Sequence, residues 1–176
     1  MYLEYASIWK NWFSGMNSYL ATLLLAMIPL AELRGAIPIA NQVFHMPLWQ
    51  AFLISVVGNM IPIPFILLFL GPASDWLMKR SRLFERFFDW LFARTRKKLE
   101  KKYEVYAEVA LAVFVAIPLP LTGAWTGAAA AFVFGIPFKK ALFWIFLGVL
   151  GAGLAVTAVV ASVGPNSFLW RLFVGG

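Results

Sequence analysis

The chain has no cysteine, a single histidine and few charged residues. Without cysteine it cannot form a disulfide or offer a thiolate, and one histidine does not make a conventional zinc site. Lys, Arg, Asp and Glu make up only 13% of its 176 residues, whereas 62% are hydrophobic. This balance lies well outside that of a soluble domain. We therefore expect an all-α integral membrane protein, one domain over residues 1–176, that needs no cofactor and no metal.

Catalytic residues are equally scarce. The histidine, His45, is far along the chain from any plausible nucleophile, and the two aspartates, Asp75 and Asp89, lie in a strongly basic segment. Neither serine nor aspartyl proteolysis therefore has the groups that it needs. We expect that the protein is not an enzyme.

The first apolar run is too short to cross a membrane. Residues 17–31 would cover only about 22 Å as a helix, against a hydrocarbon core of roughly 30 Å. Glu32, Arg34, Gly35 and Pro38 come next, and a second short apolar piece follows them. Two half-helices that meet at polar and helix-breaking residues describe a re-entrant hairpin. Its apex should face protein or a water-filled cavity, because irregular backbone is not tolerated against lipid.

The next run is long enough to span. Residues 48–70 carry no charge, and as a helix they would be about 34 Å long. Pro62 and Pro64 should kink this span. Gly71 and Pro72 should end it.

A basic segment, residues 72–106, separates the two halves. It contains ten of the 15 Lys and Arg residues, between Lys79 and Lys102. Apolar residues recur in it at steps of three and four, which predicts an amphipathic helix with Asp75 as its N-cap. The positive-inside rule places this helix in the cytoplasm, where it would also suit an anionic membrane surface. No nucleic-acid recognition motif accompanies the charge, so we expect no nucleic-acid binding.

The same pattern then returns. A short apolar run at residues 109–117 is broken by Pro118, Pro120 and Gly123, and a stretch of small residues follows. This predicts a second re-entrant hairpin. Residues 141–163 are uncharged and supply a second span. Its glycines are available for close helix contacts.

The two halves align as an internal repeat, about residues 17–70 and about residues 107–163. Matching positions lie 88 to 90 residues apart: Pro29 with Pro118, Gly35 with Gly123, Pro47 with Pro137, Ala51 with Ala141 and Gly58 with Gly148. With the basic segment in the cytoplasm, and with Lys139 and Lys140 at a second cytoplasmic edge, the copies have opposite orientations. Such an inverted repeat is typical of secondary transporters, whose site lies near the midplane. The alternative is a duplication that only built a packing scaffold.

Two charges in the first hairpin are the candidates for chemistry. Glu32 and Arg34 are the only charged residues between Lys10 and Asp75. Each would cost about 3 kcal/mol at the centre of a membrane helix, so the protein needs a reason to keep them. In the functional interpretation, Glu32 takes up and releases a coupling proton and Arg34 holds an anionic group such as phosphate. In the structural interpretation, the two charges pair with each other and with the backbone carbonyl groups that are left free at the break.

The second hairpin offers polar groups without charge. Thr122 and Thr126 bring hydroxyls to the break, and Trp125 brings an indole N–H. The N-terminus of a half-helix at Gly123 could help to bind an anion. The alanines after it are better explained as a small-residue helix contact. The predicted binding site comprises Glu32, Arg34, Gly35, Pro38, Thr122, Gly123, Trp125 and Thr126.

The two breaks, PLAELRGAIPIA at residues 29–40 and PLPLTGAWTGAAAA at residues 118–131, resemble those of the small multidrug export family of prokaryotic membrane proteins. This family is distantly similar to the DedA superfamily, which implies paired re-entrant hairpins and proton-dependent transport or lipid translocation, including that of undecaprenyl phosphate. By this resemblance Glu32 matches the acidic hairpin residue of DedA-type proteins. Their essential arginines have no clear match in the second hairpin.

These features predict a small, multi-pass, proton-coupled transporter of amphiphilic substrates in a prokaryotic inner membrane. Its partners would be protons, membrane lipids and an amphiphilic small molecule or lipid phosphate. Two spans and two hairpins would shield a midplane site poorly in a monomer, so we expect a homo-oligomer. The alternative function is a non-coupled lipid scramblase or a membrane-structural protein.

Overall fold

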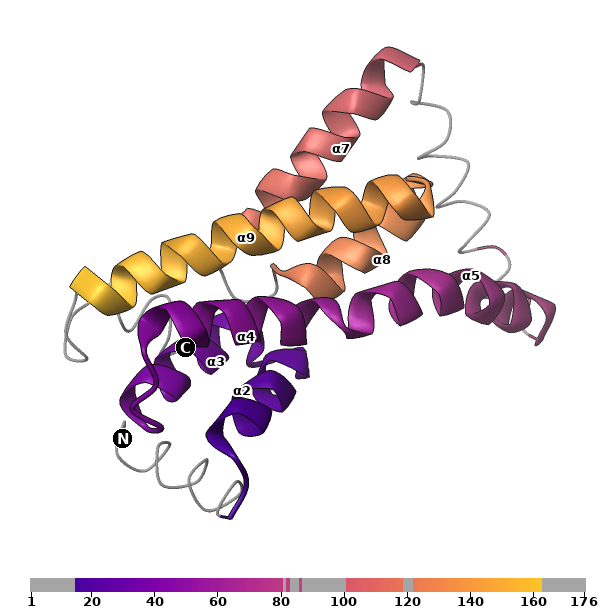
Figure 1. Ribbon diagram of the computed structural model, residues 1–176. Helices are drawn as coiled ribbons and strands as arrows, with labels where there is room; N and C mark the ends of the chain where they lie inside the picture. Colours follow the sequence, from indigo (N-terminus) through magenta and orange to yellow (C-terminus); the bar gives the residue numbers. More distant parts are fainter. Residues whose placement is uncertain (1–14, 81, 83–85, 87–100, 119–121, 163–176) are drawn as a thin grey trace.

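The computed structural model describes residues 15–80, 82, 86, 101–118 and 122–162, and every regular element within them is a helix. The helices are α2 (Ser18–Met27), α3 (Glu32–Gln42), α4 (Leu48–Met60), α5 (Pro62–Arg80), α7 (Lys101–Ala116), α8 (Ala124–Phe134) and α9 (Phe138–Ser162) (Figure 1). The all-α prediction is confirmed for this part of the chain.

The first break lies earlier than the sequence predicts. Helix α2 ends before Pro29 because a proline pushes the preceding residue out of the helical region, and Ile28 is indeed extended (φ −75°, ψ 128°). Glu32 then begins α3, so Gly35 and Pro38 lie inside this helix rather than in the break. Pro38 has no N–H to donate to the carbonyl four residues before it, but α3 continues past it.

The first long apolar segment is broken where its first proline predicts. Helix α4 ends at Met60 and α5 begins at Pro62. The predicted end at Gly71 and Pro72 is wrong, since α5 continues to Arg80 and Pro72 lies inside it. Pro72 removes only one N–H group from α5. The Gly71 carbonyl, next to Pro72, accepts a hydrogen bond of 2.8 Å from the Ser74 hydroxyl.

Most of the predicted basic helix lies outside the described residues. At its ends, residues 75–80 belong to α5 and residues 101–106 belong to α7. Asp75 is therefore inside α5 and is not an N-cap, which corrects that part of the prediction. The amphipathic helix between these ends stays a prediction.

The second half repeats the order of short helix, break, short helix and long helix. The break after α7 comes after Ala116, and α8 is only 11 residues long. Gly135 ends α8 in a left-handed conformation (φ +68°), which a glycine adopts without a steric cost. Helix α9 then runs for 25 residues.

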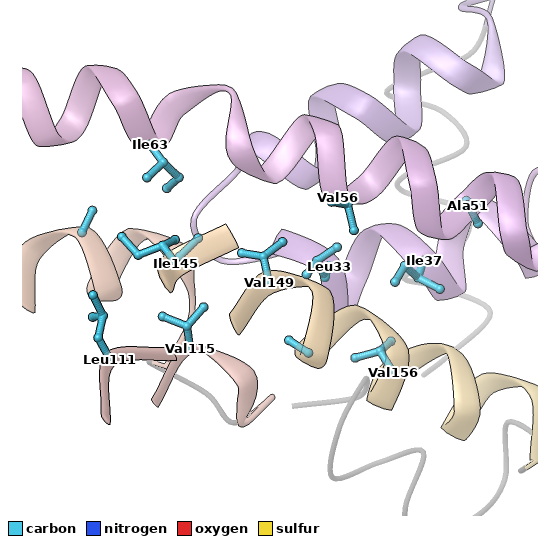
Figure 2. Packing of buried hydrophobic residues seen from close by; sticks show 14 of the residues in the cluster. Leu33, Ile37, Ala51, Val56, Ile63, Leu111, Val115, Ile145, Val149 and Val156 are labelled. Carbon is cyan, nitrogen blue, oxygen red and sulfur yellow. The ribbon is translucent and has the colours of Figure 1, made fainter. Parts of the chain in front are cut away.

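The hydrophobic core joins the two halves. Ile145, Val149 and Val156 on α9 are buried together with Leu33 on α3 and Val56 on α4 (Figure 2). Further core residues come from α3, α5 and α7: Ile37, Ile63, Leu111 and Val115. Helix α9 thus packs against α3 and α4 of the first half and against α7 and α8 of the second half.

Two glycines that the predicted repeat aligns, Gly58 and Gly148, both lie in close contact with a neighbouring helix. A Cβ atom on Gly58 of α4 would overlap the Leu23 carbonyl oxygen of α2. A Cβ atom on Gly148 of α9 would lie 2.6 Å from Val115 Cβ of α7. In each half, therefore, the long helix approaches the first short helix through a glycine, as small residues permit.

Large apolar side chains cover much of the described surface. Trp49, Phe65, Phe69, Phe143 and Leu154 are each more than half exposed. In water such a surface would be unfavourable, but it suits contact with lipid. Two segments, Leu48–Arg80 and Phe138–Ser162, are long and apolar enough to cross a membrane.

Candidate functional site

Glu32 stands at the first position of α3 in an unusual backbone conformation. Its φ of +44° lies in the left-handed region, which costs a residue with a Cβ atom about 1–3 kcal/mol. Its side chain is only 5% exposed. Strain of this kind persists only where the surroundings hold it, and it is concentrated at functional sites.

The Glu32 carboxylate reaches the N-terminus of α8, in the second half of the chain. It accepts hydrogen bonds from the backbone N–H groups of Ala124 and Trp125. The residue that precedes α8, Gly123, has no side chain with which to cap the helix. Glu32 therefore provides the cap at the positive end of the helix dipole.

Gly123 is the residue that allows this approach. A Cβ atom at Gly123 would overlap Glu32 Oε2 and would lie 2.6 Å from Glu32 Cδ. Any other residue would have to displace the carboxylate or α8. Glu32 and Gly123, which lie 91 positions apart in the sequence, therefore meet in a direct contact beside the two breaks.

A small cavity lies beside this contact. Its volume is about 10 Å³, roughly enough for one water molecule. It is lined by residues of α3, α4, α7, α8, α9 and the second break: Glu32, Leu33, Arg34, Asn59, Val115, Pro118, Thr122, Gly123, Ala124, Val149 and Ala152. Two polar atoms of these residues, Arg34 Nε and Asn59 Oδ1, are buried without a hydrogen-bond partner.

Arg34 is half-buried and is not joined to Glu32 by an ion pair in the part of the chain that the structure describes. The carboxylate bonds to α8 instead. The charge of Arg34 nevertheless acts on the Glu32 carboxylate, and that carboxylate bonds to free backbone groups, so the structural interpretation and the functional one both stay open. The Arg34 guanidinium keeps donor capacity for another group.

The structure brings together four of the eight predicted site residues around the cavity, Glu32, Arg34, Thr122 and Gly123. Trp125 takes part through its backbone N–H, while its indole Nε1 is buried without a partner.

The other three predicted residues lie outside the cavity lining. The Thr126 hydroxyl donates to the Gly123 carbonyl at 3.1 Å, inside its own helix turn. Gly35 and Pro38 are in α3, away from the lining.

Asn59 is the polar side chain of the cavity lining that the site prediction missed. It is 1% exposed and lies one turn before the break at Pro62. The sequence feature that points to Asn59 is an amide side chain isolated in an uncharged apolar run. Burying such a polar group is costly, so it usually has a role.

A second buried carboxylate, Glu108 on α7, is also absent from the prediction. It accepts hydrogen bonds of 2.8 Å from Lys140 Nζ and from Trp144 Nε1, both on α9. The bond from Lys140 holds the pKa of the Glu108 carboxyl below its ordinary value. Glu108 lies outside the two long apolar helices and away from the cavity, and it joins α7 to the start of α9. No group of three or more His, Cys, Asp or Glu residues suited to a metal occurs among the described residues.

The helical fold, its lipid-suited surface and its two long apolar helices define a helical membrane protein. Residues 32–155 match the model of the family described as Putative small multi-drug export protein. This stretch is more than half of the chain, and it includes every residue that lines the cavity, so the protein belongs to this family. No curated protein and no solved structure matches the chain. The family named from the two sequence breaks is thereby confirmed, while the similarity to the DedA superfamily stays an expectation.

Proposed function

We propose that the protein is a proton-coupled exporter of amphiphilic molecules, in which Glu32 exchanges the proton. The observation that carries this proposal is the contact between the Glu32 carboxylate and the N-terminus of α8. The proposal makes the contact a switch between two states, because protonation changes the charge of the group that holds two hairpins together.

The ionised carboxylate is the form that suits the observed arrangement. It accepts bonds from two backbone N–H groups, and its charge is favourable at the positive end of a helix. A protonated carboxyl group is neutral and loses much of this attraction. Proton uptake by Glu32 would therefore loosen α3 from α8 and expose the helix terminus.

The released helix terminus and Arg34 together would form an anion site. Backbone N–H groups at a helix N-terminus bind phosphate and carboxylate groups, and Arg34 has an unpartnered Nε in the same cavity. The anionic group of a substrate would thus take the place that the Glu32 carboxylate leaves. A cavity of about 10 Å³ admits no such group, so the described state is the closed one.

The proposed transport cycle also uses the inverted repeat of two re-entrant hairpins. The repeated order of helices and the equivalent contacts of Gly58 and Gly148 support it. Opposite orientation would let the two breaks meet at the midplane, where broken helices of transporters bind their substrates. The proposed location is a prokaryotic inner membrane, with several passes and a homo-oligomeric assembly.

The second candidate is a scaffold or lipid scramblase that uses no proton. The same contact favours it, since Glu32 already has two backbone partners and would stabilise the packing of α3 on α8 without changing its protonation.

Transport in proteoliposomes separates the two candidates. The full chain is reconstituted, and the flux of a fluorescent anionic lipid and of a cationic dye is measured with and without an imposed pH gradient. Glu32→Gln should abolish gradient-driven flux, because glutamine keeps the shape of the side chain but carries no exchangeable charge. Glu108→Gln, the matched change at the other buried glutamate, should leave that flux unchanged. If flux through the native protein is the same with and without the pH gradient, the proposal is contradicted and the second candidate is favoured.

A further inference from the structure

A wide groove lies beside the break between α4 and α5, away from the Glu32 cavity. Its volume is about 700 Å³, and it is bounded by the α4–α5 break on one side and by the first three turns of α9 on the other. The residues that line it are Val56, Val57, Met60, Ile61, Pro64, Lys139, Leu142, Phe143 and Phe146. It shares no lining residue with the cavity.

The groove is apolar except at one end. Val57, Ile61 and Phe143 are each more than a third exposed in it, so its wall has no covering within the described chain. Lys139, at the second position of α9, is the single charged residue among those that line it. A long apolar slot with one cation at its end has the chemistry of a site for an anionic amphiphile.

Lys139 and its neighbour Lys140 are in different electrostatic situations. Lys140 donates to the buried Glu108 at 2.8 Å, so its charge is compensated within the fold. Lys139 is exposed, and no carboxylate among the described residues forms an ion pair with it. The charge that faces the groove is thus the one still available to a ligand.

We propose that this groove binds an anionic membrane phospholipid, with an acyl chain between α4–α5 and α9 and the phosphate at Lys139. The site goes beyond the proposed exchange of proton and substrate at Glu32, since it binds a resident lipid and shares no residue with that cavity. Lysine at the start of a long apolar helix lies at the height of lipid headgroups, and basic positions between membrane helices suit anionic headgroups.

A second copy of the chain is a poorer occupant. The two carboxylates whose side chains the structure describes, Glu32 and Glu108, are buried and already bonded, so neither of them can pair with Lys139 of another copy. The chain as a whole carries a net charge of +7, which attracts anionic lipid to its surface. An anionic phospholipid has a phosphate that complements the charge of Lys139 and acyl chains that suit the apolar wall.

The test is the retention of lipid by the purified full-length protein, measured by native mass spectrometry. The protein in detergent is titrated with phosphatidylglycerol or with phosphatidylcholine of the same acyl chains. The native protein should retain phosphatidylglycerol more strongly, and Lys139→Gln should lower its apparent affinity about fivefold, the effect of one lysine near a lipid surface. Lys140→Gln is the matched control and should change the affinity much less.

A second variant tests the apolar wall. Val57→Trp places a large side chain in the groove from a position that is 55% exposed, so the fold should tolerate it and the retention of both lipids should fall. Equal retention of the two lipids by the native protein, or equal losses in Lys139→Gln and Lys140→Gln, would overturn the proposal. A protein dimer that excludes lipid would also overturn it, in favour of a second copy in the groove. Glu32→Gln should keep full lipid retention, so failure of the lipid site and failure of the transport proposal give different results.

Discussion

Glu32 and Gly123 are in contact so close that any side chain on Gly123 would collide with the Glu32 carboxylate. One residue begins α3 and the other precedes α8, so a single contact joins the two breaks of the chain. The contact also explains the strained backbone at Glu32, whose φ of +44° is held by the bonds that its side chain makes to Ala124 and Trp125. The proposed function depends on this contact more than on either residue alone.

The contact predicts strong coupling between substitutions at its two ends. Gly123→Ala should displace the carboxylate and destabilise the fold, and Glu32→Ala should remove both the cap and the collision. In a double-mutant cycle measured by thermal unfolding in detergent, the double variant should be more stable than the sum of the single changes by about 1–3 kcal/mol. Gly71→Ala is the control, because a Cβ there meets nothing within 4 Å. Additive losses would show that the two residues do not touch.

The proposed repeat predicts matched losses of stability at the two glycines that it aligns. Gly58→Ala would push α4 from α2, and Gly148→Ala would push α9 from α7, where its Cβ would lie 2.7 Å from the Ala112 carbonyl oxygen. Each change should lower the free energy of unfolding by about 1–3 kcal/mol, the usual cost of overpacking. Thermal unfolding of the two variants beside Gly71→Ala checks this. A loss at only one of the two positions would argue that the halves are not equivalent.

Glu108 and Lys140 predict a stability that depends on pH. The folded state holds the pKa of Glu108 below its ordinary 4.5, so the pair contributes fully above that value and its contribution is lost as the pH falls through the lower, folded pKa. Glu108→Gln should therefore be less stable than the native chain at pH 7, by about 1 kcal/mol because Lys140 is half exposed.

Unfolding curves of both proteins between pH 7 and pH 3 check the prediction for Glu108, with Lys140→Gln as a second way of breaking the pair. The difference from the native chain should shrink as the pH falls. A difference that stays constant over this range would mean that the ionised carboxylate contributes nothing.

The sequence predicted the order of the short and long apolar helices because the apolar runs and prolines carry that information locally. It misplaced the first break because Pro29 acts on the residue before it, so that α2 ends there and Glu32 already starts the next helix. It also took Gly71 and Pro72 as an end, although a helix supported by tertiary packing survives one missing N–H.

Part of the site could likewise be predicted from local patterns in the sequence. Charge inside an apolar run pointed to Glu32 and Arg34, and the second break pointed to Gly123. The bond from Glu32 to α8 and the arrival of Asn59 at the cavity depend on how α3, α4 and α8 pack, which no local pattern encodes. The apolar groove is likewise formed by segments that are far apart in the sequence.

Asn41 and Asn59 differ in hydrogen bonding, so replacing each by leucine should change the stability of the fold differently. Asn41 Nδ2 donates to the Met46 carbonyl at 3.0 Å, whereas Asn59 Oδ1 is buried in the cavity lining without a partner. Removing a satisfied hydrogen bond costs about 1 kcal/mol, so Asn41→Leu should lower the stability. Asn59→Leu removes an unsatisfied buried atom at similar volume, and the stability should stay the same or rise.

Burying Asn59 Oδ1 without a partner lowers the stability of the fold. A role of Asn59 in proton transport would explain why the chain has an asparagine there. The cavity has room for about one water molecule beside Glu32, and Asn59 Oδ1 would accept a hydrogen bond from that water. Asn59→Leu should then slow flux driven by a pH gradient in proteoliposomes, while Asn41→Leu should leave flux per folded protein unchanged. Thermal unfolding and flux are measured on the same preparations. A stable Asn59→Leu variant with native flux would exclude a role for this asparagine in delivering protons to Glu32.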